Sequence, residues 1–124
     1  MESKKPPKIL VVDDEAVVRQ LVTVMLRKAG YDDVLQAEDG RAALEVLEQI
    51  RYDVALVITD IRMPRMDGCQ LSTHIRLGWP HIKVLCVSGF ADPLSPNGHY
   101  FLPKPFTATA LIAIVRDVMD ICAA

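Results

Sequence analysis

Five polar side chains each follow a short apolar run, although the runs lie far apart in the sequence. Asp13 and Asp14 come directly after KILVV, and Asp60 comes directly after DVALVIT. Ser88 follows IKVLCV, and Lys104 stands just beyond a shorter apolar run. If these runs are neighbouring parallel strands, their carboxyl ends share one edge of a sheet. Three carboxylates, one hydroxyl and one ammonium would then meet there.

The side chains of this set suit the transfer of a phosphoryl group. Three carboxylates close together repel one another unless a cation lies among them. Carboxylate oxygens with few other protein ligands suit Mg²⁺, which keeps several waters and often binds phosphate as well. An ammonium and a hydroxyl can both bind phosphoryl oxygens, and a central aspartate can attack phosphorus to form an aspartyl phosphate.

Each member of the set also has a purely structural interpretation. Two aspartates after a strand commonly cap a helix, and the segment MPRMDG can be only a turn. A serine or a lysine at the end of a strand is often only a polar residue where the chain leaves the sheet and meets solvent. The joint occurrence of all these residues at predicted strand ends favours the chemical interpretation.

The apolar runs alternate with segments of helical periodicity. Runs that are apolar at every position indicate strands buried on both faces. Helical spacing follows the first run, and Asp39 can cap a second helix. Since crossovers between parallel strands must lie on the sheet faces, we predict an α/β protein with a doubly wound, five-stranded parallel sheet. The expected strands are residues 8–12, 34–37, 53–59, 82–87 and 101–102.

Composition narrows the function classes. The 124 residues carry a formal charge of −2, from 14 basic and 16 acidic side chains, and suit one domain with residues 1–7 as a disordered lead-in. Nothing in this balance attracts nucleic acid or an anionic membrane, and no apolar run approaches the roughly 18 residues of a membrane span. Three scattered cysteines suit free thiols in a reducing compartment, so we expect a cytoplasmic domain.

Four stretches make the sequence similar to a known family. The chain resembles the receiver domain of two-component response regulators, stand-alone or of the hybrid-kinase type. The resemblance implies a flavodoxin-like fold with strand order 2-1-3-4-5 and a receiver domain over residues 8–124. The partner would be a sensor histidine kinase or a histidine phosphotransfer protein, whose phosphohistidine supplies the phosphoryl group. The matching stretches are ILVVDDE (9–15), TDIRMPRMDG (59–68), VLCVSGF (84–90) and FLPKPF (101–106).

The resemblance also implies a role for each residue at the expected site. Asp60 would be the phosphoacceptor, and Asp14 would bind Mg²⁺ directly. Asp13 would act largely through bound water, and the backbone carbonyl of Arg62 would be a further ligand. The remaining roles are the switch hydroxyl of Ser88, the switch aromatic ring of Phe101, the phosphate-contacting Lys104 and a cis peptide bond before Pro105. Such a domain signals rather than acts as an enzyme, although it can assist its own phosphorylation and dephosphorylation.

Three features depart from the family pattern. The segment ADPLSPNGHY (91–100) has two prolines and Asn-Gly, so we predict that the fourth covering helix is missing or reduced to a turn. The usual dimer face of the family would lack that helix. Phe101 has no hydroxyl, so any switching by its ring is steric. We hypothesise that Arg62 and Phe90, which flank the expected site, tune access to the phosphoryl group.

Two other functions stay open at this point. The chain can be a protein-binding module of the same fold that is not phosphorylated, with an unknown downstream partner. The complete set of acidic, hydroxyl and lysine residues argues against that alternative. It can also be a magnesium-dependent phosphatase with an aspartyl nucleophile, but such enzymes carry a second aspartate two residues on, where this chain has Arg62.

Overall fold

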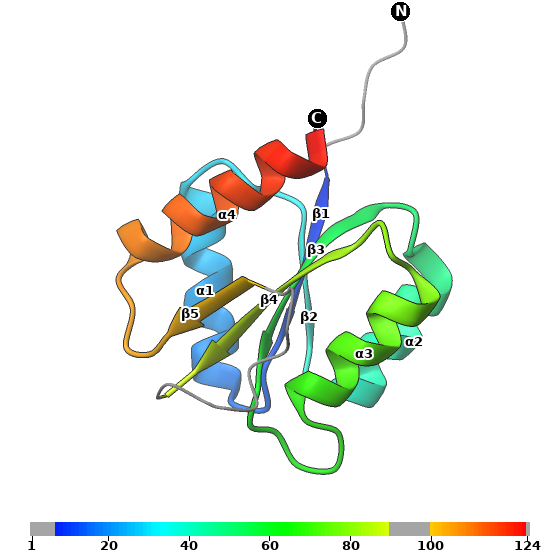
Figure 1. Ribbon diagram of the computed structural model, residues 1–124. Coiled ribbons are helices and arrows are strands. Elements are labelled where there is room, and N and C mark those ends of the chain that lie inside the picture. The colour runs from blue at the N-terminus through cyan, green and yellow to red at the C-terminus, as the bar shows by residue number, and fades with distance from the viewer. Residues whose placement is uncertain (1–6, 90–99, 124) are drawn as a thin grey trace, which may run out of the picture.

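The computed structural model describes residues 7–89 and 100–123, with the backbone alone for residues 121–123. These residues form five strands and four helices (Figure 1). In chain order they are β1 (Lys8–Val12), α1 (Ala16–Lys28), β2 (Val34–Ala37), α2 (Gly40–Ile50), β3 (Val54–Asp60), α3 (Gly68–Gly78), β4 (Lys83–Ser88), β5 (Tyr100–Pro103) and α4 (Ala108–Ala123).

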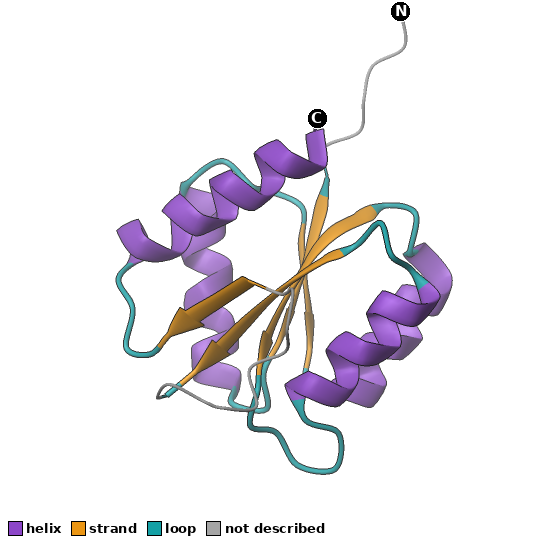
Figure 2. Cartoon of the chain, viewed as in Figure 1, coloured by secondary structure: helices purple, strands orange, loops and turns teal. Residues whose placement is uncertain are grey.

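The strands form one parallel sheet in the order β2-β1-β3-β4-β5, which confirms the predicted order. α1 and α4 cover one face of the sheet, and α2 and α3 cover the other (Figure 2). Because all five strands run in the same direction, their carboxyl ends lie along one edge. The predicted doubly wound α/β fold is therefore confirmed.

The strands of the sheet interior are apolar at successive positions because both faces are buried. In β1, Ile9 and Val11 belong to the core beneath α1 and α4, whereas Leu10 and Val12 belong to the core beneath α2 and α3. Cys86 of β4 lies in the second core, where burial raises the pKa of its thiol to about 12. Its role there is apolar packing, as its position within a strand predicts.

Side-chain caps mark the start of the two helices that precede and follow β3 in the chain. Asp39 accepts a hydrogen bond from the backbone nitrogen of Ala42 at 2.8 Å, as predicted for the start of α2. Asp67 and Gln70 form a reciprocal capping box at the start of α3. The second cap fixes where the chain turns into α3 after the loop that follows Asp60.

Three strands extend one residue beyond their predicted carboxyl ends, and β5, which ends at Pro103, also begins one residue early at Tyr100. β3 includes Asp60, which pairs with Val87, and β4 includes Ser88, which pairs with Pro103. The sequence-based boundary placed these polar residues outside the strands. The parallel ladder is made by backbone groups, so a polar side chain at the sheet edge does not end it. Both side chains are consequently held on a rigid strand rather than on a loop.

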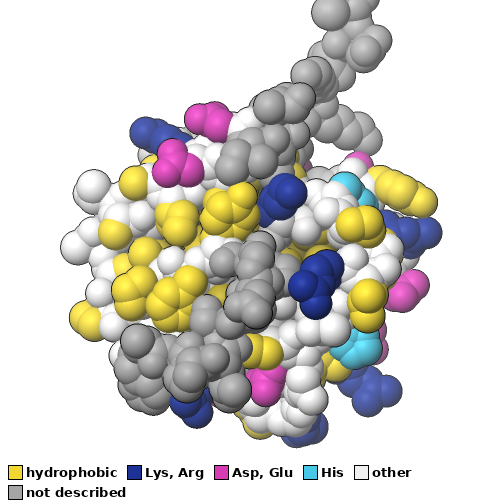
Figure 3. Space-filling view, viewed as in Figure 1, with side chains coloured by type: hydrophobic (Ala, Val, Ile, Leu, Met, Phe, Trp, Pro, Cys, Tyr) yellow, Lys and Arg dark blue, Asp and Glu magenta, His cyan; other side chains and the backbone are white. Residues whose placement is uncertain are grey.

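The predicted loss of a covering helix concerns residues 91–100, of which 91–99 lie outside the described residues and Tyr100 begins β5. The helix labelled α4 in Figure 1 is the one that follows β5. No helix within the described ranges is long and apolar enough to span a bilayer. On the face drawn in Figure 3, basic and acidic side chains are interspersed.

Candidate functional site

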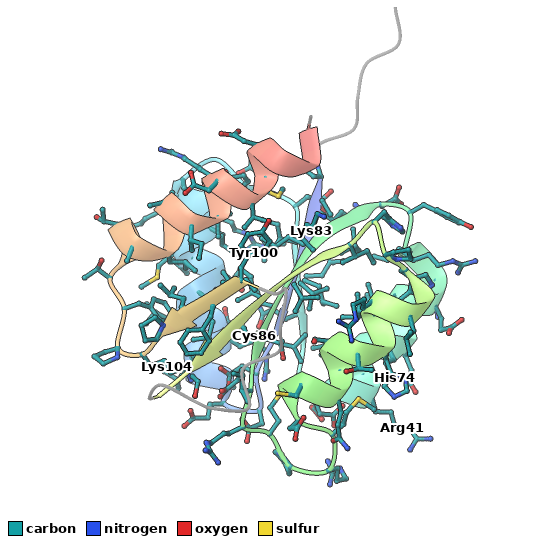
Figure 4. The ribbon with its side chains drawn as sticks, in the orientation of Figure 1. Arg41, His74, Lys83, Cys86, Tyr100 and Lys104 are labelled. Carbon is teal, nitrogen blue, oxygen red and sulfur yellow. The ribbon has the colours of Figure 1, made fainter. Side chains whose placement is uncertain are left out.

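The carboxyl edge of the sheet brings together the residues that the sequence places after separate strands. Lys104 Nζ lies 3.2 Å from Asp60 Oδ2 and 3.8 Å from Asp13 Oδ2. One carboxylate oxygen from each of Asp13, Asp14 and Asp60 lies within 4.8 Å of the other two. Lys104 stands at the tip of β5 on this edge (Figure 4). Four side chains from three strand ends thus surround one small volume.

The turn after β1 holds one buried and one exposed carboxylate. The backbone nitrogen of Asp13 donates to the carbonyl of Ala37 at 3.2 Å, which continues the contact with β2. Asp13 Oδ1 accepts a hydrogen bond from the backbone nitrogen of Glu15 at 2.9 Å, and only 4% of the residue is exposed. Asp14 is exposed. The turn therefore places the Asp13 carboxylate inside the edge of the sheet and leaves the Asp14 carboxylate in contact with solvent.

Asp60 is held at both carboxylate oxygens. Its Oδ1 accepts a hydrogen bond from the backbone nitrogen of Arg62 at 3.2 Å, and its Oδ2 accepts one from Lys104. The residue is buried at 8% exposure. Two donors on different oxygens fix the plane of the Asp60 carboxylate, so the fold sets its orientation at the carboxyl edge of the sheet.

Lys104 is brought into the site by the segment that follows β5. Its backbone nitrogen donates to the carbonyl of Ser88, and the Lys104–Pro105 peptide bond is cis. Lys104 is half-buried, and the pair it forms with Asp60 is charge-assisted. β4 and β5 therefore end side by side, with a hydroxyl on one and an ammonium on the other.

Ser88 is fully buried, and its Oγ has no hydrogen-bond partner among the described residues. A buried hydroxyl without a partner is unfavourable by about 1–3 kcal/mol, so such a group at a site is commonly explained by a ligand. Phe101 is half-buried and packs against the core beneath α2 and α3. The side chain of Arg62 is exposed, and Phe90 lies outside the described residues.

The most buried carboxyl of the acidic cluster, that of Asp13, has a raised pKa. Burial raises the pKa of Asp13 from 3.8 to about 6, and the neighbouring carboxylates of Asp60 and Asp14 act in the same direction. The hydrogen bond from Glu15 and the charge of Lys104 oppose this rise. Among the described residues, the cluster thus holds more negative charge than Lys104 neutralises, an arrangement that favours a cation among the carboxylates.

The raised pKa predicts how stability depends on pH in the absence of metal. Between about pH 4 and pH 6 the unfolded chain loses the proton of Asp13 while the folded protein keeps it, so the free energy of unfolding falls as pH rises. Asn at this position keeps the hydrogen bond to Glu15 and removes the charge. We expect Asp13→Asn to be more stable than the wild type by about 1–2 kcal/mol above this window.

Urea unfolding of both proteins in a chelator, from acidic to neutral pH, measures this difference. Carboxylates outside the cluster act equally in the two proteins, so the difference between them reports on Asp13 together with its coupling to Asp14 and Asp60. A difference that stays constant with pH would show that the Asp13 carboxyl titrates as it does in the unfolded chain.

One contact at the site was not foreseen from the sequence. The guanidinium of Arg19, on α1, donates to the backbone carbonyl of Asp13 at 2.7 Å and to Gln36 Oε1 on β2 at 3.2 Å. Arg19 follows the acidic turn by six residues, and in the sequence it is one polar position of an amphipathic helix. Because Arg19 lies six residues after Asp13, the sequence pattern does not show that the path of α1 brings the Arg19 side chain back to the end of β1.

The donor set fits a hard divalent cation. Three carboxylates supply the oxygen ligands that Mg²⁺ prefers, while the exposure of Asp14 leaves room for water. The raised pKa of Asp13 and the Ser88 Oγ, which has no partner in the part of the chain that the structure describes, are consistent with an edge arranged for further ligands. The residues present therefore suit Mg²⁺ together with a phosphoryl group.

Comparisons with known proteins agree on one family. The family model described as the response regulator receiver domain matches residues 9–116. A chemotaxis protein CheY homolog of Campylobacter jejuni is 35% identical over 120 residues, which cover 90% of this chain and 92% of that protein. The sensor kinase CckA of Brucella abortus is 36% identical over 118 residues, or 90% of this chain, but the chain spans only 12% of its length.

Solved structures give the same result. The crystal structure of the receiver domain from the hybrid histidine kinase CckA is 35% identical and superposes with a TM-score of 0.78, covering 90% of this chain and 97% of that one. A response regulator receiver domain protein from Clostridium thermocellum is 28% identical, with a TM-score of 0.85 over 92% of this chain and 94% of that one.

Proposed function

The chain belongs to the response regulator receiver domain family, and on that premise we propose that Asp60 accepts a phosphoryl group from the phosphohistidine of a partner protein. The receiver unit would comprise residues 8–124. Like other receiver domains it is a signalling domain rather than a classical enzyme. The partner would be a sensor histidine kinase or a histidine phosphotransfer protein, and the location would be cytoplasmic.

The observation that supports this proposal most is the contact of Asp60 with Lys104 among three carboxylates. An Asp60 carboxylate oxygen would attack phosphorus while the phosphorus–nitrogen bond of phosphohistidine breaks, and the electron pair of that bond would leave with the imidazole nitrogen. The Lys104 ammonium, now 3.2 Å from Asp60 Oδ2, would neutralise charge on the phosphoryl oxygens. The chemistry is mainly positioning and charge neutralisation.

Asp13, Asp14 and Asp60 would hold Mg²⁺, with the Arg62 carbonyl as a further ligand. When bound, the ion would neutralise the negative charge that three carboxylates and a phosphoryl group bring together. The hydrogen bond from the Arg62 nitrogen to Asp60 Oδ1 supports this assignment because it places the Arg62 backbone at the site.

Ser88 and Phe101 would carry the response to phosphorylation. The Ser88 hydroxyl, which has no partner among the described residues, would donate to a phosphoryl oxygen. Such a bond would bias the end of β4 toward a second arrangement, and Phe101 on the neighbouring strand would repack. The exposed surface changed in this way would bind a downstream protein. The Arg62 side chain and Phe90 would tune access to the phosphoryl group.

The test is the intact mass of the wild-type protein after incubation with acetyl phosphate and Mg²⁺. We expect one added phosphoryl group per chain, and none when a chelator replaces the metal. Phosphorylated histidine kinases and phosphotransfer proteins would serve as a second class of donor. Absence of any adduct with both classes would contradict the proposal and favour the protein-binding module.

A further inference from the structure

Arg19 connects the acidic turn to two elements of secondary structure. It lies in the second turn of α1, which begins directly after the acidic turn (Figure 1). Its Nη1 donates to the carbonyl of Asp13 at 2.7 Å, and its Nε donates to Gln36 Oε1 on β2 at 3.2 Å. The side chain is half-buried, so these hydrogen bonds are partly shielded from water. One guanidinium thus joins α1, β2 and the residue that carries the most buried carboxylate.

The acidic turn has few other restraints. Glu15, the N-cap of α1, makes no side-chain capping hydrogen bond. Among the described residues, the backbone nitrogen of Asp13 donates to the Ala37 carbonyl, its Oδ1 accepts from the Glu15 nitrogen, and its carbonyl accepts from Arg19. The three carboxylates repel one another and so push the turn away from Asp60. A charge-assisted hydrogen bond on the Asp13 carbonyl opposes this displacement.

We propose that Arg19 is a positioning residue that holds the Asp13–Asp14 turn in the geometry that binds Mg²⁺. It acts through the backbone of Asp13 and does not touch the metal. Gln36 would orient the guanidinium, as outer-shell partners orient the ligands of metal sites. This inference rests on the proposed function because it assumes that the acidic cluster binds Mg²⁺.

The experiment measures Mg²⁺ affinity by titration calorimetry on the unphosphorylated protein, at a pH where Asp13 is ionised. Arg19→Met keeps much of the side-chain length and removes both donors. We expect it to weaken Mg²⁺ binding about tenfold, the usual effect of losing an outer-shell partner. Arg19→Lys should recover part of the affinity, since an ammonium can reach one acceptor but cannot hold two as a fork.

Two variants separate positioning from general stability. Thr23→Val removes the buried hydroxyl that donates to the Arg19 carbonyl at 2.8 Å, so it weakens α1 without touching the acidic turn. Arg27→Met removes an exposed arginine from the last turn of the same helix. We expect both to bind Mg²⁺ within about twofold of the wild type, because neither substitution removes a donor to the Asp13 carbonyl. Urea unfolding of each variant gives its stability for comparison.

The outcomes distinguish this inference from the function on which it rests. Wild-type affinity in Arg19→Met, or an equal loss in Thr23→Val at equal stability, overturns the positioning role while leaving the phosphoacceptor intact. A wild-type protein that binds no Mg²⁺ overturns the metal assignment itself. If Arg19→Met does not fold, Gln36→Leu releases only the Nε contact, and we expect a loss of about threefold. Unchanged affinity in that variant would equally contradict the inference.

Discussion

Replacing Asp60 with asparagine is expected to reduce phosphoryl uptake from one group per chain to none. An amide is a far weaker nucleophile than a carboxylate, and among the described residues no other carboxylate shares the position of Asp60. Both of its oxygens are held, one by the Arg62 nitrogen and one by Lys104. Asparagine has nearly the same shape and can keep the hydrogen bond to Arg62, so the effect should come from the chemistry. Intact mass after incubation with acetyl phosphate and Mg²⁺ measures it.

Asp67→Asn is the matched control for this variant. Asp67 lies in the same loop and caps α3 through the backbone nitrogen of Gln70. Asparagine caps helices about as well as aspartate, so this variant should fold and be phosphorylated like the wild type. Full uptake by Asp60→Asn, or a loss confined to Asp67→Asn, would show that the acceptor is a different residue.

Gly68→Ala is expected to destabilise the protein by about 3 kcal/mol, at the upper end of overpacking effects. A Cβ at this position would lie 2.4 Å from the carbonyl oxygen of Asp60 and 2.8 Å from the Cα of Ile61. Both are backbone atoms at the end of β3, so no side-chain rotation can make room. The Gly68 nitrogen also donates to the Ile61 carbonyl at 2.8 Å, which binds the start of α3 to that strand.

Urea unfolding measures this loss, and Gly78→Ala is its control. Gly78 ends the same helix, and within the described ranges a Cβ there would meet no atom of another element within 4 Å. Alanine should leave the stability unchanged or raise it by up to about 1 kcal/mol, because it favours the helix and restricts the unfolded chain. Equal effects of the two substitutions would mean that the contact with Asp60 does not explain the need for glycine at position 68.

The close contact at Gly68 links stability to the expected chemistry. The atoms that a side chain would displace belong to Asp60 itself and to the residue that follows it. A folded Gly68→Ala protein would therefore carry a displaced acceptor. Its phosphoryl uptake should fall even under conditions where the chain stays native.

Much of the fold was predictable from the sequence because burial leaves a local pattern. The run KILVV is apolar at every position, and the structure buries its two faces in two different cores. Asp39 was predicted as a helix cap, and its side chain accepts from Ala42 as expected. The strand order followed from the resemblance and is confirmed. The predicted ends of the strands were less accurate than their order, since the hydrogen-bonded ladder continues through Asp60 and Ser88 despite their polar side chains.

The order of residues along the chain is enough to tell which chemical groups reach the edge of the sheet. Parallel strands end together, so residues that follow separate apolar runs must lie near one another. The residues that this argument brings together are Asp13, Asp14, Asp60, Ser88 and Lys104. Their individual roles remain predictions.

How these groups are held depends on the packing of helices and strands against one another. Four features depend on distances between elements: the raised pKa of Asp13, the contact of Gly68 with Asp60, the bond from Arg19 to the Asp13 carbonyl, and the Ser88 hydroxyl without a partner among residues 7–89 and 100–120. A sequence pattern records whether a side chain faces the core or solvent. It does not record which atoms meet across two packed elements, because the angles and spacing of that packing depend on the whole core.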